Sequence, residues 1–173
     1  MKIILISGKA EAGKDLTAEI FKELISPLRS IRLAYGDYVK TTAREIWGWN
    51  GLKDEAGRTL LQWWGTDCVR AKETTFWVDS VIRLAKVIPD IIDFISVTDV
   101  RFPNEITAWA DSGFDVVTVR IERPGHISSL SAEQLLHISE TALDNWKFDV
   151  VLSATDKVKL TQEIQNKLIP ILK

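Results

Sequence analysis

Short apolar runs recur along the chain, separated by longer segments with helical periodicity. The segment Ile3–Ser7 is an unbroken run of this kind, which is typical of a strand buried on both faces of a parallel sheet. A second buried strand is predicted at Phe94–Asp99. Shorter runs predict three further strands, at Ser30–Ala34, Val116–Ile121 and Val150–Leu152.

Helical patterns fill most of the intervening sequence, at Lys14–Leu24, Tyr38–Trp47, Asp54–Lys72 and Thr75–Val87. Pro103 suits the first turn of a further helix, and Gly113 suits its end. Ser131 with Gln134 resembles a capping box, and Asp156 is placed to cap the last helix. Strands that alternate with helices predict βαβ units, and therefore an α/β protein with a parallel sheet.

Length, charge and cysteine content narrow the class of protein. The 173 residues suit one domain, so we expect a single domain over residues 1–173. The formal net charge of −2 argues against a protein that coats a nucleic-acid polymer, because such a surface is usually basic. The apolar run that follows Lys2 is too short for a signal peptide or a membrane span, and Cys68 is the only cysteine. We therefore expect a cytoplasmic protein with neither membrane nor nucleic-acid partners.

A phosphate-binding loop is predicted between the first strand and the first helix. Gly8–Lys14 fits G-x-x-x-x-G-K in the strand-to-helix context that this motif requires. In such a loop, backbone N–H groups, the helix dipole and the lysine charge all face phosphate oxygens. The alternative is an ordinary turn that contains glycine. We predict that the following residues bind ATP: Gly8, Lys9, Ala10, Glu11, Ala12, Gly13, Lys14, Asp15 and Leu16.

Two acidic residues are candidate ligands of Mg²⁺. Asp15 stands where a Ser or Thr usually follows the lysine, and a carboxylate is a hard ligand that suits Mg²⁺. Asp99 ends a predicted central strand, where P-loop proteins place a second acid. Arg101, two residues later, is suited to clamp a phosphate. Two alternatives stay open: Asp15 as an acid that the helix dipole stabilises, and Asp99 paired with Arg101 in the loop.

Four segments together resemble bacteriophage deoxynucleoside monophosphate kinases, and the resemblance runs from Ile3 to about Leu168. These segments are Gly8–Asp15, Arg58–Asp67, Asp99–Glu105 and Ser139-Glu140. The resemblance implies a P-loop, nucleoside-monophosphate-kinase-like three-layer fold, in which helices flank a parallel central sheet. It also implies ATP as donor, Mg²⁺ as metal and a deoxynucleotide as acceptor, makes a homodimer plausible, and places a phage protein in the host cytoplasm. The sequence departs from the family at Leu16, where Thr or Ser is usual. It departs again at residues 153–156, where nucleotide kinases often carry Asn and Gly.

The helices over about 37–88 are the predicted acceptor side. One face of the helix that begins at Asp54 carries residues that suit base and phosphate recognition: Arg58, Gln62, Thr66 and Arg70. A merely solvated face is the alternative. Gly65 favours a pocket, because glycine inside a helix costs about 1 kcal/mol against alanine, so a close contact or a helix break is expected there. The resemblance adds Asp37 and Lys40, and Arg101 completes the predicted acceptor site.

A mobile lid is a further hypothesis, over about 123–140, because Arg123 precedes an irregular stretch at Pro124 and Gly125. A solvated surface loop is the alternative. Lys14, Arg101 and Arg123 are the predicted catalytic cations. For the tryptophans that could stack on a base, core packing is the favoured interpretation: Trp63, Trp64 and Trp77.

The leading functional hypothesis is ATP- and Mg²⁺-dependent phosphorylation of deoxynucleoside monophosphates to diphosphates. Such a reaction needs no general base, because the attacking phosphate oxygen is already ionised. A kinase of another small metabolite is the first alternative, with Asp37 as a candidate base. A P-loop NTPase without kinase activity is the second.

Overall fold

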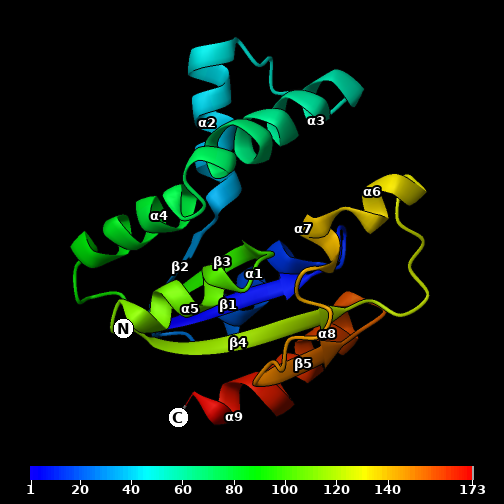
Figure 1. The fold of residues 1–173 in the computed structure, drawn as a ribbon. Coiled ribbons are helices and arrows are strands. Elements are labelled where there is room, and N and C mark those ends of the chain that lie inside the picture. The colour runs from blue at the N-terminus through cyan, green and yellow to red at the C-terminus, as the bar shows by residue number, and fades with distance from the viewer. Residues whose placement is uncertain (173) are drawn as a thin grey trace. The chain divides into compact units, whose positions relative to one another are not determined.

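Five strands form one sheet in the computed structural model, which describes residues 1–172, except for the side chain of Ala132. Their order across the sheet is β2-β3-β1-β4-β5 (Figure 1). The strands are β1 (Lys2–Gly8), β2 (Ser30–Leu33), β3 (Phe94–Val100), β4 (Asp115–Glu122) and β5 (Val150–Ser153). All five predicted strands are therefore confirmed, with ends that differ by at most one residue.

Strand β1 lies at the centre and pairs in parallel with both β3 and β4. It faces β4 in an unbroken register from Lys2 opposite Asp115 to Gly8 opposite Ile121. Every residue from Ile3 to Gly8 is buried, as the apolar run predicts. The carboxyl ends of three neighbouring strands consequently meet at one edge of the sheet.

Helices cover both faces of this sheet. The step from β1 to β2 and the step from β3 to β4 run in opposite directions across the sheet. Because crossover connections are right-handed, α1 (Lys14–Leu24) and α5 (Asn104–Asp111) cover opposite faces (Figure 1). The predicted α/β fold with a parallel sheet between helices is thus confirmed.

The main core lies between the sheet and α1. Ile4 and Ile6 of β1 pack there with Phe21 of α1 and with Leu160 and Ile164 near the C-terminus. Ile3 and Leu5 alternate with them and are also fully buried, on the opposite face. Full burial of each such side chain stabilises the fold by roughly 1.5–3 kcal/mol relative to exposure.

Short helices complete this part of the chain: α6 (Ala132–Leu136), α7 (Ile138–Thr141), α8 (Lys157–Glu163), a π-helix η2 (Ile164–Leu168) and α9 (Ile169–Ile171). The capping box of Ser131 with Gln134 is present at α6. Asp156 caps α8 and accepts a hydrogen bond from the N–H of Lys159 at 2.9 Å. Pro170 follows η2, and a proline inside a helix removes one N–H and crowds the carbonyl four residues earlier, which favours such a local change of helix type.

The chain divides into two compact units. The first contains Met1–Arg32 and the segment from Ile88 onward, and the second is Leu33–Val87. The second unit holds α2 (Tyr35–Trp47), α3 (Glu55–Gln62), a π-helix η1 (Trp63–Arg70) and α4 (Phe76–Val87). Among the described residues, no helix is both long enough and apolar enough to traverse a lipid bilayer.

The helix predicted over Asp54–Lys72 is present, but its type changes along its length. It is α-helical only to Gln62 and then widens into the π-helix η1. Gly65 lies in this π-helix, and a Cβ there would come within 3.1 Å of the Val39 Cγ1 atom. The expected close contact therefore occurs at Gly65, whereas the chain stays helical there and only the type of helix changes, at Trp63. An α-helical register does not extend from Gln62 to Arg70, since π-helices pair residues five apart.

Several tryptophan side chains contact one another in the second unit. Trp77 is buried and its Nε1 donates to the backbone oxygen of Gly65 at 2.9 Å. Trp64 is half-buried and its Nε1 donates to the Thr42 hydroxyl at 2.8 Å. Trp47 packs edge-on against Trp63, with ring centroids 5.1 Å apart. Packing is thus the observed role of Trp77, whereas Trp63 keeps 40% of its surface exposed.

Substitution of Gly57 is expected to destabilise the second unit. A Cβ at this position would lie 2.0 Å from the backbone oxygen of Leu52 and 2.9 Å from the Trp49 Nε1 that donates to that same oxygen. We expect Gly57→Ala to lower the free energy of unfolding by about 3 kcal/mol, at the upper end of overpacking effects. Urea unfolding followed by tryptophan fluorescence measures this.

The control is Thr59→Ala on the exposed side of the same helix, which should stay within about 0.5 kcal/mol of the parent. Equal stability of the two variants would contradict the close contact at Gly57.

Candidate functional site

The loop between β1 and α1 has the backbone of a phosphate cradle. Gly13 precedes the helix with φ 101°, a left-handed backbone conformation that residues with a side chain rarely adopt. A Cβ at Gly8 would lie 2.7 Å from the backbone oxygen of Ile121, so only glycine allows β1 to approach β4 so closely at that point. Both glycines of the motif are therefore required by the geometry of the loop.

Lys14 curls back over this loop. Its Nζ donates to the backbone oxygens of Gly8 and Lys9, at 2.9 Å each. Burial, together with the positive charge of Arg101, lowers the pKa of Lys14 to about 8. The ammonium group is thus held at the loop by neutral carbonyls, and an anionic ligand is a stronger hydrogen-bond partner than a carbonyl.

Asp15 lies in the first turn of α1, and one of its oxygens has two partners. Its Oδ1 accepts from the Arg32 Nε and from the Thr98 hydroxyl, both at 2.6 Å. Partial burial raises the pKa of this carboxyl, but the hydrogen bonds from Thr98 and Arg32 outweigh it, so the pKa lies below its usual value. Asp15 is therefore an ionised carboxylate beside the end of β3.

Asp99 lies at the end of β3, next to Thr98. The negative charges of Asp15 and Asp99 both act on Lys14, so the two acids lie at the same edge of the sheet as the loop. Within residues 1–172, no group of three or more His, Cys, Asp or Glu side chains is placed to enclose a metal.

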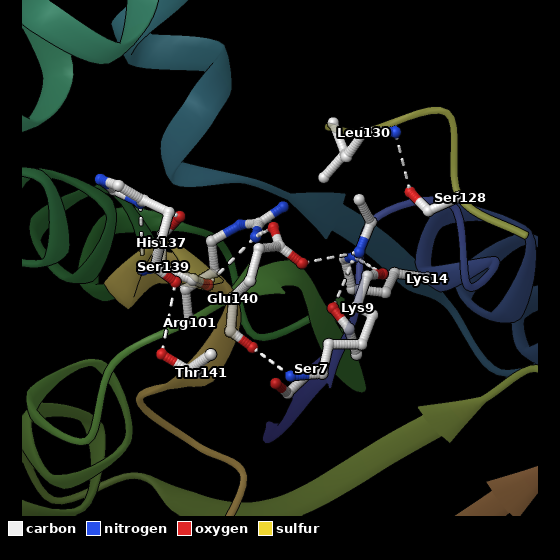
Figure 2. A network of polar contacts seen from close by, with 12 residues as sticks. Ser7, Lys9, Lys14, Arg101, Ser128, Leu130, His137, Ser139, Glu140 and Thr141 are labelled. Carbon is white, nitrogen blue, oxygen red and sulfur yellow. Dashed lines mark hydrogen bonds and ion pairs between the residues drawn. The ribbon is translucent and has the colours of Figure 1, made fainter. Parts of the chain in front are cut away.

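Arg101 is paired with Glu140 rather than pointing into solvent. Its Nη1 donates to Glu140 Oε1 and, at 3.1 Å, to the backbone oxygen of Ser139. The other carboxylate oxygen of Glu140 accepts from the N–H of Ala10 in the loop, at 2.9 Å. Glu140 thus lies between Arg101 and the loop, as Figure 2 shows.

A second group of charges anchors Lys9. Its Nζ donates to Asp144 Oδ1 at 2.6 Å and to the backbone oxygen of Glu140, also at 2.6 Å. Asp144 in turn accepts from Arg120 at 3.1 Å, and Arg120 reaches the Ser7 hydroxyl at 3.3 Å. Lys9 is thereby held on the side of the loop rather than at its centre.

The segment over 123–140, predicted as a lid or a surface loop, contacts the tip of the phosphate loop. The Glu11 carboxylate accepts from the hydroxyl of Ser129, from its N–H at 3.1 Å, and pairs with His126 at 3.0 Å. The hydrogen bonds from Ser129 lower the pKa of Glu11 to about 2. Arg123 reaches the backbone oxygen of Glu11 at 3.4 Å. Whether the segment moves stays a prediction.

A small pocket of about 110 Å³ adjoins the loop and the N-terminus of α8. Its walls combine apolar and charged groups: Ala12, Gly13, Leu16, Ile121, Arg123, Ala154, Thr155, Asp156, Lys157 and Leu160. Leu16, which departs from the family pattern, therefore provides an apolar wall, while the neighbouring Thr17 is buried and donates to Gly13 O at 2.9 Å.

The predicted acceptor residues, apart from Arg101, belong to the second unit. Lys40 pairs with Asp37 at 2.9 Å within α2. Arg58 is exposed and its Nε donates to the backbone oxygen of Lys53 at 2.9 Å. Gln62 is exposed, whereas Thr66 and Arg70 in η1 are half-buried. That these side chains bind one acceptor stays a prediction.

Sequence reasoning assigned no role to several groups that hold the site together, although Glu105 and Glu140 belong to segments that carry the resemblance: Arg32, Thr98, Glu105, Glu140 and Asp144. Glu105 is the clearest case, because it is 1% exposed and its Oε2 accepts from the N–H of Arg101 at 2.6 Å and of Phe102 at 3.1 Å. An acid within the first turn of a helix after a loop was the available signal. The partners of Asp15 and Glu140 are distant in sequence and left no such signal.

No family model matches the chain, and no curated protein matches it. Solved structures do match its fold. An APS kinase from Mycobacterium tuberculosis, in complex with AMPPNP and APS, is 15% identical with a TM-score of 0.51, covering 96% of each chain. A gluconokinase from Sinorhizobium meliloti is 15% identical with a TM-score of 0.53, covering 99% of this chain and 93% of that one. A shikimate kinase from Bacteroides thetaiotaomicron is 15% identical with a TM-score of 0.52, covering 99% and 98%. These structural neighbours are P-loop kinases.

The loop geometry predicts that Lys14 contributes much of the affinity for a phosphate chain. We expect Lys14→Ala to weaken binding of inorganic tripolyphosphate by roughly ten- to hundred-fold, the size of one or two charge-assisted hydrogen bonds. Isothermal titration calorimetry measures this affinity for tripolyphosphate. Lys22→Ala, at the other end of the same helix, should bind like the parent, and an equal loss in both variants would remove Lys14 from the site.

Proposed function

We propose that the protein transfers the γ-phosphoryl group of ATP to a deoxynucleoside monophosphate, giving the diphosphate. The observation that carries the proposal is the convergence of Lys14, Asp15, Asp99 and Arg101 on one glycine-bounded loop. Phosphoryl transfer depends mainly on positioning and on the neutralisation of developing charge, and these residues are of the types that it uses. The resemblance to phage deoxynucleotide kinases names the acceptor.

The donor would lie with its phosphates in the loop Gly8–Lys14 and its base in the pocket beside Leu16 and Thr155. Lys14 then moves its hydrogen bonds from the loop carbonyls to the β- and γ-phosphates. Asp15 and Asp99 would hold Mg²⁺, which when bound neutralises charge on the phosphate chain. Arg123, on the wall of the pocket, is placed to contact the same phosphate chain.

In this proposal the second unit holds the acceptor through these residues: Asp37, Lys40, Arg58, Gln62, Thr66 and Arg70. A monophosphate acceptor needs cations rather than a general base, and the second unit supplies them. Asp37 is already paired with Lys40, which favours a positioning role over that of a base.

A kinase of another small metabolite is the second candidate. The observation that favours it is the fold, because a gluconokinase and a shikimate kinase share it. The same site chemistry would serve, with a different acceptor in the second unit.

One assay separates these functions. ADP formation is measured with ATP and Mg²⁺, alone and with each deoxynucleoside monophosphate, each ribonucleoside monophosphate, gluconate or shikimate. The proposal expects ADP formation that depends on one or more deoxynucleotides, with the diphosphate as product. Turnover that needs no acceptor would indicate an NTPase, and turnover only with gluconate or shikimate would indicate the second candidate.

The two acids should affect the metal requirement. Asp15→Asn and Asp99→Asn each remove one negative ligand, so we expect the Mg²⁺ concentration for half-maximal activity to rise roughly ten-fold in each. A Mg²⁺ titration at saturating ATP measures this. Asp111→Asn, at the exposed end of α5, is the control. Parental titration curves for both site variants would make these acids structural.

Two arginines should affect the catalytic efficiency with the acceptor. We expect Arg58→Lys and Arg70→Lys to reduce kcat/KM for the monophosphate by roughly ten- to hundred-fold, although both keep the charge, because lysine cannot bind a phosphate bidentately. Steady-state kinetics with varied monophosphate at saturating ATP give this ratio. Arg83→Lys on the exposed face of α4 is the control. Loss of ATP binding instead would mean that the two substrates are assigned to the wrong residues.

A further inference from the structure

The dipeptide Ser139-Glu140 has no role in the proposed reaction, yet Glu140 is a buried acid whose carboxylate contacts the loop. Its side chain is 6% exposed, on the four-residue helix α7. A buried carboxylate is costly unless it is paired and hydrogen-bonded. Its position therefore depends on the partners that surround it.

Those partners all belong to the phosphate site. Arg101 donates to one carboxylate oxygen of Glu140, and the N–H of Ala10 donates to the other at 2.9 Å. The backbone oxygen of Glu140 accepts from Lys9 at 2.6 Å, and that of its neighbour Ser139 accepts from Arg101 at 3.1 Å (Figure 2). A single turn of helix thus contacts the end of β3 and the phosphate loop together.

We propose that Glu140 is a positioning residue, which fixes the Arg101 guanidinium and the Ala10 backbone relative to each other so that both face the transferred phosphate correctly. The effect of Glu140 on kcat rests on the proposed function. Its effect on phosphate binding rests on the phosphate site alone.

The opposite role, a carboxylate that blocks the loop until phosphate displaces it, fits the geometry less well. Displacement of Glu140 would leave Arg101, which is only 29% exposed, without its anion. It would also break two backbone contacts of α7, those to Lys9 and Arg101. Glu140 is therefore built into the site and does not stand in for a ligand.

The test compares two buried glutamates. Glu140→Gln removes the charge at the site and keeps the size of the side chain. Glu163→Gln is the matched control: Glu163 is 9% exposed, accepts from the N–H of Ser153 at 3.1 Å and pairs with Lys167 at 2.7 Å. We expect Glu140→Gln to lower kcat roughly ten- to hundred-fold and to weaken tripolyphosphate binding roughly ten-fold, with parental values for Glu163→Gln.

A double-mutant cycle separates positioning from general support of the fold. If Glu140 acts mainly through Arg101, kcat of the Arg101→Gln, Glu140→Gln double variant should lie within about three-fold of Arg101→Gln alone. Additive losses would overturn the inference, as would parental kinetics and binding for Glu140→Gln, or tighter tripolyphosphate binding. If Glu140→Gln does not fold by circular dichroism, Glu140→Asp replaces it. Aspartate keeps the charge but is too short to reach Arg101 and Ala10 together, so the same losses are expected.

Failure of the proposed function and failure of the inference about Glu140 can be told apart. If the parent protein transfers phosphate to no deoxynucleotide, the proposed function fails. The tripolyphosphate titration then decides the role of Glu140 by itself. A parent protein that binds no tripolyphosphate would overturn both.

Discussion

Parallel pairing of β1 with both β3 and β4 is the constraint on which the rest of the site depends. It brings the end of β1, where the loop begins, beside the end of β3, which carries Asp99 and is followed by Arg101. The same pairing brings Arg120 of β4 to Ser7. Strand β1 must be buried on both faces to take this central place, and its unbroken apolar sequence is what permits it. The charged side chains at this edge of the sheet are thus brought together by the pairing of the buried central strand β1.

Acidic side chains offset part of the positive charge around the phosphate loop. Lys9, Lys14, Arg101 and Arg120 lie around one loop, and such a concentration of cations destabilises a protein unless anions offset it. Glu140 and Asp144 offset the outer cations, whereas Lys14 in the middle donates to the carbonyl oxygens of Gly8 and Lys9. Among these cations, Lys14 is therefore the one that would gain most from an anionic ligand.

Local sequence signals were sufficient for the strands, for the first helix and for the caps at Ser131 and Asp156, because each depends on residues a few positions apart. The predicted loop is present for the same reason. The helix from Asp54 was predicted only in part: the contact between Gly65 and Val39 and the change to a π-helix arise from packing within the second unit, which the periodicity of one segment does not encode. Glu140 and Asp144 lie more than a hundred residues from the loop that they hold, so no motif spacing pointed to them.

The second unit is one uninterrupted stretch, Leu33–Val87, placed in the chain between β2 and β3. The groups assigned to the donor, from the loop to Arg123 and the pocket beside α8, all lie outside that stretch. In the proposed function most of the acceptor residues lie inside that stretch. A change of acceptor would then call mainly for substitutions in one continuous portion of the gene.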